Sequence, residues 1–350
     1  MNNIQSFYKN KKVFVTGHTG FKGSWLASVL IKFGAKVTGY SLNDEKRTNY
    51  ENFTNYRKIQ NIYGDICNLK KLKNSIKTAK PEIIFHLAAQ PIVADSYTNP
   101  LNTLRINFMG SINILEVVRN FSNIKSLVMI TSDKCYQNRE ILRGYKEDDR
   151  LGGNDPYSAS KAAVEIVFQS YLSSFFSKKK NGVGTARAGN VIGGGDWSKN
   201  RIIPDCIRTI IKKKNLIIRN PLSTRPWQHV LEPISGYLLL GKKLFENPKR
   251  FSGSWNFGPP TKEVKNVREV AKIIMSQIEQ GEKTKIIFKK GSFEEANLLK
   301  LNSKKANEFL HWRTKWTMNQ ALKKTAKWYN FFLKKKNTRK LTNIQIENYF

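Results

Sequence analysis

The sequence contains few cysteines, and their placement excludes two kinds of protein. Only three occur among the 350 residues, at Cys67, Cys135 and Cys206. An odd number at wide spacing provides neither the disulfide framework of a small secreted domain nor a Cys-x-x-Cys metal knuckle. We therefore expect the protein to work in a reducing compartment, the cytoplasm.

Histidine is also scarce, which argues against a metal centre. The four histidines, His18, His86, His229 and His311, show neither His-x-x-x-His nor His-Glu-x-x-His spacing. A single histidine in such a sequence more often packs or forms a hydrogen bond than binds a metal ion. We expect no metal.

Long apolar runs are absent as well. Residues 1–12 are polar and lack the apolar segment of a signal peptide. No stretch stays apolar over the roughly 20 residues that a membrane-spanning helix needs. We expect a cytoplasmic protein with no membrane partner.

Acidic residues are few compared with basic ones. Lys and Arg total 61 against 26 Asp and Glu, which gives a net charge of +35. Such an excess can indicate binding to nucleic acid or to an anionic membrane. The lysines are spread over the whole chain, however, and the runs at 178–180, 212–214 and 334–336 fall where helices are expected to end and where cations suit the helix dipole. We expect no nucleic-acid partner, although a positive field would attract a diphosphate substrate.

Apolar, strand-like runs alternate with amphipathic stretches through the first half of the chain. The expected strands are residues 13–16, 36–40, 61–63, 83–87, 127–131 and 183–188. This alternation is typical of an α/β fold, a Rossmann-type doubly wound parallel sheet with helices on both faces. We expect this domain to span residues 1–189.

From Asn190 onward the pattern changes to short helices and Gly/Pro turns. An isolated strand is expected near residues 216–218, and further strand material at Val264 and residues 285–288. We interpret residues 190–335 as a smaller substrate-binding region from which the chain crosses back to the first domain. Residues 336–350 form a basic tail that is either docked or frayed.

The first expected strand runs into a glycine-rich turn. Gly17, Gly20 and Gly23 have the spacing of a dinucleotide site, in which the glycines allow a tight turn, close approach of a pyrophosphate and close helix packing. His18 and Lys22 lie in the same turn, where a basic side chain could reach a cofactor phosphate. A purely structural glycine turn is the alternative.

Two positions at which an acidic residue could bind the adenosine half of such a cofactor can be located in the sequence. An acidic residue at the end of the second strand would bind the ribose of NAD, but residues 40–42 read Tyr-Ser-Leu and Asp44 comes later. This position therefore does not decide between NAD and NADP. Asp65 and Ile66, after the third strand, are placed to meet the adenine, although an Asp in a turn has an ordinary capping role too.

A second group of residues indicates proton transfer. Tyr157 and Lys161 are four apart and would share one face of a helix. An ammonium near a phenol favours the phenolate, so we expect Lys161 to lower the pKa of Tyr157. Ser132 falls at the carboxyl end of the fifth strand, where ligands bind in parallel sheets, and Asp133 and Lys134 place an acid and an amine beside it.

These motifs together resemble the extended short-chain dehydrogenase/reductases that modify nucleotide sugars, the NAD-dependent epimerase/dehydratase family. The resemblance covers nearly the whole chain and rests on residues 17–26, 86–91, 131–136, 155–161, 186–197 and 225–230. It implies NAD as the cofactor and a homo-oligomer, a dimer or tetramer. The Asp133-Lys134 pair favours the 4,6-dehydratase branch that acts on CDP-glucose, because related dTDP-glucose dehydratases carry Asp-Glu there and epimerases lack the pair.

The reaction that the resemblance implies begins with oxidation at the sugar C4. Tyr157 would deprotonate the 4-hydroxyl, aided by Lys161 and Ser132, as NAD takes the hydride. Lys134 would then remove the C5 proton while Asp133 protonates the departing 6-hydroxyl, and hydride would return to C6. The 4-keto-6-deoxy product would feed deoxysugar and lipopolysaccharide biosynthesis. Lys134 must be neutral to act as a base, so its pKa has to be lowered, and a structural Asp-Lys salt bridge is the alternative.

The resemblance also carries over ligand contacts. Those to the cofactor fall on Gly17, His18, Gly20, Phe21, Lys22, Gly23, Asp65, Ile66, Leu87, Ala88, Ala89, Asn107, Tyr157 and Lys161. Those to the substrate fall on Gln90, Asn190, Arg201, Arg208, Arg225 and Trp227. Arginine pairs with phosphate oxygens in a bidentate manner, while surface ion pairs and, for the tryptophan, packing are the alternatives.

One departure from the family pattern leaves a loop unassigned. Glu294-Glu295-Ala296 stands where relatives show His-Glu-Ala. Two other functions stay open: a sugar-nucleotide epimerase or reductase of the same fold, and a basic NAD-binding regulator or RNA-binding protein. A regulator or RNA-binding protein would need an outward-facing basic patch with interleaved aromatics.

Overall fold

The chain is built around a seven-stranded sheet. The computed structural model describes residues 2–43, 55–260, 265–289 and 298–350. The strand order is β11-β6-β5-β4-β1-β2-β3, and every neighbouring pair is parallel. The strands are β1 (Lys12–Thr16), β2 (Lys36–Ser41), β3 (Ile59–Tyr63), β4 (Ile83–His86), β5 (Ser126–Ile130), β6 (Gly182–Ala188) and β11 (Gly253–Phe257). This order confirms the predicted Rossmann-type fold.

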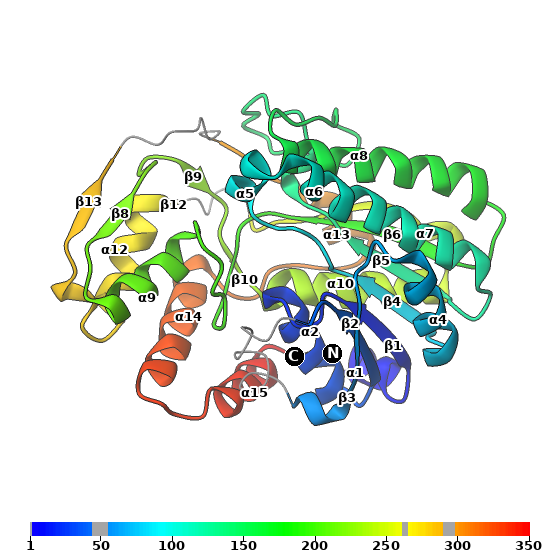
Figure 1. The fold of residues 1–350 in the computed structure, drawn as a ribbon, viewed down its shortest axis with the longest axis horizontal. Helices are drawn as coiled ribbons and strands as arrows, with labels where there is room; N and C mark the ends of the chain where they lie inside the picture. Colours follow the sequence, from blue (N-terminus) through cyan, green and yellow to red (C-terminus); the bar gives the residue numbers. More distant parts are fainter. Residues whose placement is uncertain (1, 44–54, 261–264, 290–297) are drawn as a thin grey trace.

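Helices cover both faces of the sheet (Figure 1). Along β1, Val13 and Val15 join one core while Phe14 joins the other, as the two-residue period of a strand requires. The first core is closed by α1 (Asn2–Tyr8), α2 (Phe21–Lys32) and α10 (Leu231–Glu246), and the second by α4 (Leu69–Ala79), α7 (Gly110–Asn120) and α8 (Pro156–Tyr171). The burial of both faces explains why the central strands β1, β4 and β5 read as largely apolar runs, whereas the edge strand β3 is partly exposed and contains Gln60 and Asn61.

The edge strand β11 is not among the strands predicted from sequence. Ser254 and Asn256 break its apolar pattern, yet every residue of β11 is buried. The structure satisfies both side chains, because the Ser254 hydroxyl donates to Glu165 (3.1 Å) and the Asn256 amide to the Tyr145 carbonyl (2.8 Å). Together with α10 and α11 (Pro248–Phe251), β11 lies with the sheet although it follows the predicted boundary at residue 189.

The remaining residues form a smaller lobe beside the carboxyl ends of the strands (Figure 1). It contains α9 (Ile202–Lys212), β8 (Leu216–Ile218), α12 (Val267–Gln277) and β13 (Ile286–Phe288), with the short pairs β7 (Val191–Ile192) with β10 (Gln228–His229) and β9 (Thr224–Arg225) with β12 (Lys265–Asn266). The prediction of an isolated strand at residues 216–218 is wrong: β8 pairs in parallel with β13, which lies far away in sequence. Val264 lies outside the described residues.

The end of the chain is docked as a helix. α14 (Met318–Leu333) is followed by α15 (Thr338–Tyr349), and Trp328 of α14 donates to the Thr342 hydroxyl at 2.9 Å. The Tyr349 hydroxyl donates to the buried Glu232 carboxylate of α10 at 2.6 Å. In the part of the chain that the structure describes, no helix has the length and apolar character to span a bilayer.

Candidate active site

In the glycine turn after β1, backbone atoms pack tightly against Gly17 and Gly23. Gly17 has a φ of +70°, and a Cβ there would lie 2.7 Å from the Ala88 backbone nitrogen. A Cβ on Gly23 would lie 2.1 Å from the Gly17 carbonyl oxygen. No side chain caps α2 at Gly20, so the N–H groups of its first turn are presented at the turn. These features fit the pyrophosphate of a dinucleotide.

Two residues predicted to contact the cofactor have internal partners. The His18 ring is fully buried, with Nε2 2.8 Å from the Asn61 side-chain oxygen, and a Cβ on Gly39 would collide with it. Asp65 accepts from the Cys67 N–H at 2.9 Å and from Arg105 at 3.2 Å. The packing role of His18 and the turn role of Asp65 are therefore visible, and their cofactor contacts stay predictions.

The loop after β4 is anchored from two directions. The Thr16 hydroxyl accepts from the N–H groups of Leu87 (3.1 Å) and Ala88 (3.2 Å). Asn107 accepts from the Gln90 N–H at 2.8 Å and donates to the Ser160 hydroxyl of α8 at 2.9 Å. Asn107 lies in a π-helical turn, Arg105–Met109, a feature often found at functional sites. Ala89 and Ile66 flank the same edge of the sheet, where β4 and β3 end.

An acid lies at the carboxyl end of β5. Asp133 is 3% exposed and begins a short 3₁₀ turn, Asp133–Cys135; the Ser132 hydroxyl donates to its Oδ1 at 3.0 Å. Its Oδ2 has no hydrogen-bond partner among the described residues. Burial raises the pKa of Asp133, against the opposing charges of Lys134, Arg225 and Lys22 and the Ser132 hydrogen bond. The protonated form that a proton donor needs is thereby favoured.

A phenol and an amine lie on α8, next to this acid. Asp155 caps the helix by accepting from the Ser158 N–H at 2.9 Å, and the Lys161 ammonium lies 5.9 Å from the Tyr157 ring centroid. Burial lowers the pKa of Lys161 to about 8. Burial also raises the pKa of Tyr157 to about 12, with a smaller opposing effect from a hydrogen bond with Ser132. The expectation of a lowered tyrosine pKa is wrong for the chain by itself, because desolvation of the phenolate outweighs the neighbouring cations.

Lys22 interacts electrostatically with Asp133 and Lys161. Burial and then the Arg201 charge lower its pKa to about 8, Asp133 opposes this shift, and Lys161 adds to it. From the sequence, Lys22 is expected only at a cofactor phosphate. Its position one residue after Phe21, in the first turn of α2, also brings it close enough to interact with Asp133 and Lys161.

Two of the three predicted substrate arginines adjoin the site, and the third does not. Arg201 donates to Asp196 at 2.9 Å and its charge acts on Tyr157, while the charge of buried Arg225 acts on Asp133. These two therefore adjoin the site. Arg208 instead donates to the carbonyls of Trp197 (2.8 Å) and Ser198 (3.0 Å) and holds that loop.

Two further predicted substrate residues have structural contacts. Trp227 is 7% exposed and donates to the Lys265 carbonyl at 3.3 Å. The Asn190 carbonyl accepts from the Gln228 N–H at 3.1 Å. Their substrate contacts stay predictions, and Glu294 and Asp44 lie outside the described residues. Within residues 2–43, 55–260, 265–289 and 298–350, no three His, Cys, Asp or Glu side chains gather as a metal ion would require.

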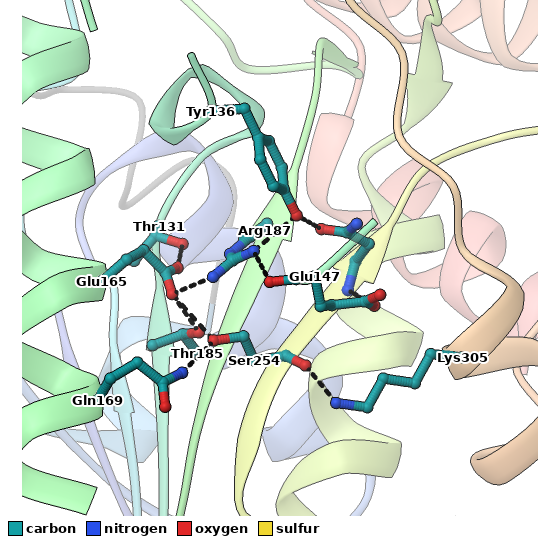
Figure 2. A network of polar contacts seen from close by, with 10 residues as sticks. Thr131, Tyr136, Glu147, Glu165, Gln169, Thr185, Arg187, Ser254 and Lys305 are labelled. Atoms are coloured by element: carbon teal, nitrogen blue, oxygen red, sulfur yellow. Dashed lines mark hydrogen bonds and ion pairs between the residues drawn. The ribbon is translucent and has the colours of Figure 1, made fainter. Parts of the chain in front are cut away.

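A buried ion pair behind the site was not identified from the sequence. Glu165 follows Lys161 by one helical turn and pairs with Arg187 of β6 at 2.7 Å (Figure 2). Two oppositely charged residues far apart in sequence carry no local signal. The available hint was the arginine in the otherwise apolar run 183–188.

Comparison with known proteins agrees with this architecture. The model of the GDP-mannose 4,6-dehydratase family matches residues 14–325. The chain is 42% identical to the CDP-glucose 4,6-dehydratase of Salmonella typhimurium, over 99% of this chain and 98% of that protein. An epimerase from Methanothermobacter thermautotrophicus superimposes with a TM-score of 0.82 (23% identity, 97% of both chains). The dTDP-glucose 4,6-dehydratase of Bacillus anthracis in complex with NAD does so with 0.75 (21% identity, 94% of this chain and 99% of that one).

Proposed function

The chain belongs to the GDP-mannose 4,6-dehydratase family, and on that premise we propose that it is a CDP-glucose 4,6-dehydratase, an NAD-dependent hydro-lyase. The product is CDP-4-keto-6-deoxyglucose and water. The observation that carries the proposal is the buried Asp133, next to Ser132 and Lys134 at the carboxyl end of β5 and adjoining Tyr157. A full-length relative of that name supports the choice of nucleotide sugar.

The cofactor is NAD, and the chain offers a place for it. Gly17, Gly20 and Gly23, with the N–H groups at the start of α2, would hold its pyrophosphate. The anchored loop at Leu87–Gln90 lies at the neighbouring strand ends. When bound, NAD accepts a hydride from C4 of the sugar and returns it to C6.

The residues on α8 serve the oxidation step. Tyr157 takes the proton of the sugar 4-hydroxyl, and Ser132 hydrogen-bonds the same oxygen. The Lys161 ammonium, 5.9 Å from the Tyr157 ring centroid, offsets the charge that forms on Tyr157 as the proton is taken. Because burial raises the pKa of Tyr157 to about 12, the phenolate is rare near neutral pH before the sugar proton is transferred.

The residues after β5 serve the elimination step. The C4 ketone acidifies the C5 hydrogen, which Lys134 removes. Asp133, whose pKa is raised by burial, donates a proton to the departing 6-hydroxyl, so that water leaves across C5 and C6. Arg201 and Arg225 adjoin these groups and supply positive charge for the sugar diphosphate.

The test is mass spectrometry after mixing the purified protein with CDP-glucose, and separately with dTDP-glucose and UDP-glucose, with and without added NAD. Loss of one water from CDP-glucose alone is the expected result. Unchanged masses for all three would refute the dehydratase assignment and favour epimerisation, which leaves the mass unaltered.

The same proposal includes a cytoplasmic homo-oligomer. Helices α6 (Pro100–Leu104) and α8 pack side by side and expose Leu101 (78%) and Ile166 (58%), and Leu104 and Met109 lie nearby in sequence with about half of their surface exposed. A second copy of this chain would cover them. Light scattering should show a dimer or tetramer, and Leu101→Asp should shift it toward the monomer.

A further inference from the structure

Behind the proposed catalytic residues lies a buried polar cluster that the reaction does not use directly (Figure 2). We infer that Glu165 is a positioning residue: its carboxylate is the buried counter-charge of the Lys161 ammonium, and with Arg187 it fixes the segment that carries Ser132, Asp133 and Lys134. The inference rests on the proposed function for its role in catalysis. It goes beyond that function because Glu165 touches none of the reacting groups assigned above.

The Glu165 carboxylate ties α8 to three neighbouring strands. Its Oε1 accepts from the Thr131 hydroxyl at 2.5 Å, just after β5. Its Oε2 accepts from Thr185 of β6 (2.8 Å), Arg187 of β6 (2.7 Å) and Ser254 of β11 (3.1 Å). Figure 2 shows these side chains converging on the carboxylate. Thr131 directly precedes Ser132, so one end of the catalytic segment is fixed by Glu165.

Arg187 fixes the other end of that segment. Its Nη1 donates to the Tyr136 hydroxyl at 2.6 Å and to the Glu147 carbonyl at 3.0 Å. The Tyr136 hydroxyl in turn donates to Asn256 of β11 at 2.8 Å. Residues 132–135 therefore lie between Thr131, which is hydrogen-bonded to Glu165, and Tyr136, which is hydrogen-bonded to Arg187. The Glu165–Arg187 ion pair thus fixes both ends of this segment.

The charges around Lys161 make Glu165 its counter-charge. Lys161 is 6% exposed and lies one turn before Glu165, which is fully buried, on α8. The other titratable groups near it are Tyr157 on the same helix, Cys135 after β5, His86 at the end of β4, and Lys22 on α2. Burial raises the pKa of Cys135 and lowers that of His86 to about 3, so both are neutral near pH 7.

Glu165 itself remains ionised. Burial acts to raise its pKa, but Arg187 and the hydrogen bonds from Thr131 and Thr185 lower it overall. The carboxylate thus opposes the effect of burial on the pKa of Lys161. Glu165 is the charged group that acts most strongly on the Lys161 ammonium, and Arg187 offsets part of its charge.

The experiment compares Glu165→Gln with Arg187→Lys. The first removes the counter-charge, so the pKa of Lys161 should fall by about one pH unit or more; the second keeps a cation beside Glu165, which stays ionised, so the pKa of Lys161 should stay close to that of the parent. The readout is the pH dependence of Lys161 acetylation by acetic anhydride, quantified by peptide mass spectrometry. This readout needs no sugar nucleotide, so it does not depend on the proposed function.

A merely structural ion pair would lower thermal stability in both variants without moving the pKa of Lys161. An unchanged Lys161 pKa in folded Glu165→Gln, or an equal fall in both variants, would overturn the inference. Because an unpaired buried charge can prevent folding, the double variant E165Q/R187Q is included, and it should titrate between the two single variants.

Glu116→Gln on α7, which removes a partly exposed pair with Arg119 (2.7 Å), is the matched control and should leave Lys161 unshifted. In turnover assays the alkaline limb of kcat should move with the Lys161 pKa, and Glu165→Asp should restore most of it. A fall of the Lys161 pKa in Glu165→Gln alone, without any dehydration by the parent, would refute the proposed function and leave this inference standing.

Discussion

Replacing Asp133 with Asn should abolish dehydration and stabilise the fold. The carboxyl is 3% exposed and its Oδ2 has no partner among the described residues. Asn keeps the shape but cannot donate the proton that the leaving 6-hydroxyl needs. Loss of a general acid typically costs about 10²–10⁴ in rate, or about 2.7–5.4 kcal/mol in the activation free energy.

The gain in stability follows from the raised pKa of Asp133. A carboxyl whose pKa is higher in the folded than in the unfolded chain destabilises the fold when it is ionised, and the effect disappears as the pH falls through the folded and then the unfolded pKa. A buried, poorly paired polar group costs about 1–3 kcal/mol. Since attraction to Lys134 and Arg225 is also lost, we expect a net gain near 1 kcal/mol, about 2 °C in Tm at pH 8.

The assay has two parts. Calorimetry of the parent and Asp133→Asn at pH 8 and near pH 4 should show a higher Tm for the variant only at the higher pH. Single-turnover absorbance at the NADH band should show C4 oxidation without the dehydrated product. Asp149→Asn, which removes a partner of the exposed Arg143 (2.6 Å), is the control and should leave turnover unchanged. A lower Tm at pH 8, or dehydration within about tenfold of the parent rate, would refute the reasoning.

Three further outcomes are expected. Lys134→Ala should still oxidise C4, seen as NADH absorbance, but stall elimination by about 10²–10⁴-fold; normal turnover would remove its assigned role. Because the pKa of Tyr157 lies at about 12, C4 oxidation should become faster as the pH rises through neutrality, and Tyr157→Phe should remove both the oxidation and its pH dependence in stopped-flow measurements. Gly23→Ala places a Cβ 2.1 Å from the Gly17 carbonyl and should cost about 1–3 kcal/mol by denaturant unfolding and weaken NAD binding in calorimetry, whereas Gly20→Ala, at 3.3 Å, should cost less; equal losses would contradict the steric argument.

The local patterns of the sequence predict the sheet but not its last strand. Residues 13–16 and 83–86 are buried on both faces, and that burial is visible as largely apolar sequence. In β11, Ser254 and Asn256 are buried polar residues whose partners come from Glu165 and Tyr145, far away in the chain. Such tertiary compensation leaves no trace in a local pattern.

In the site, too, local sequence predicts some features, and others depend on tertiary packing. Residue types at fixed spacing predict Ser132, Asp133, Tyr157 and Lys161, and the structure brings them together. The direction of the Tyr157 pKa could not be predicted, because desolvation depends on how completely the fold encloses the phenol. The same holds for Lys22, whose closeness to Asp133 results from the packing of α2 against the strand ends.

Because β11 follows β6 by more than 60 residues in the sequence, the sheet cannot be completed until well after β6 has been translated. Strand β6 is the edge of the sheet until Gly253–Phe257 has been synthesised, and the intervening chain takes roughly 3–13 s to translate at about 5–20 residues per second. During that interval β6 is an unpaired edge, and Glu165 lacks the hydrogen bond from the Ser254 hydroxyl. Slowed translation across residues 189–252 would prolong this exposure, so expression yield should respond to codon choice there more than in the segment after Phe257.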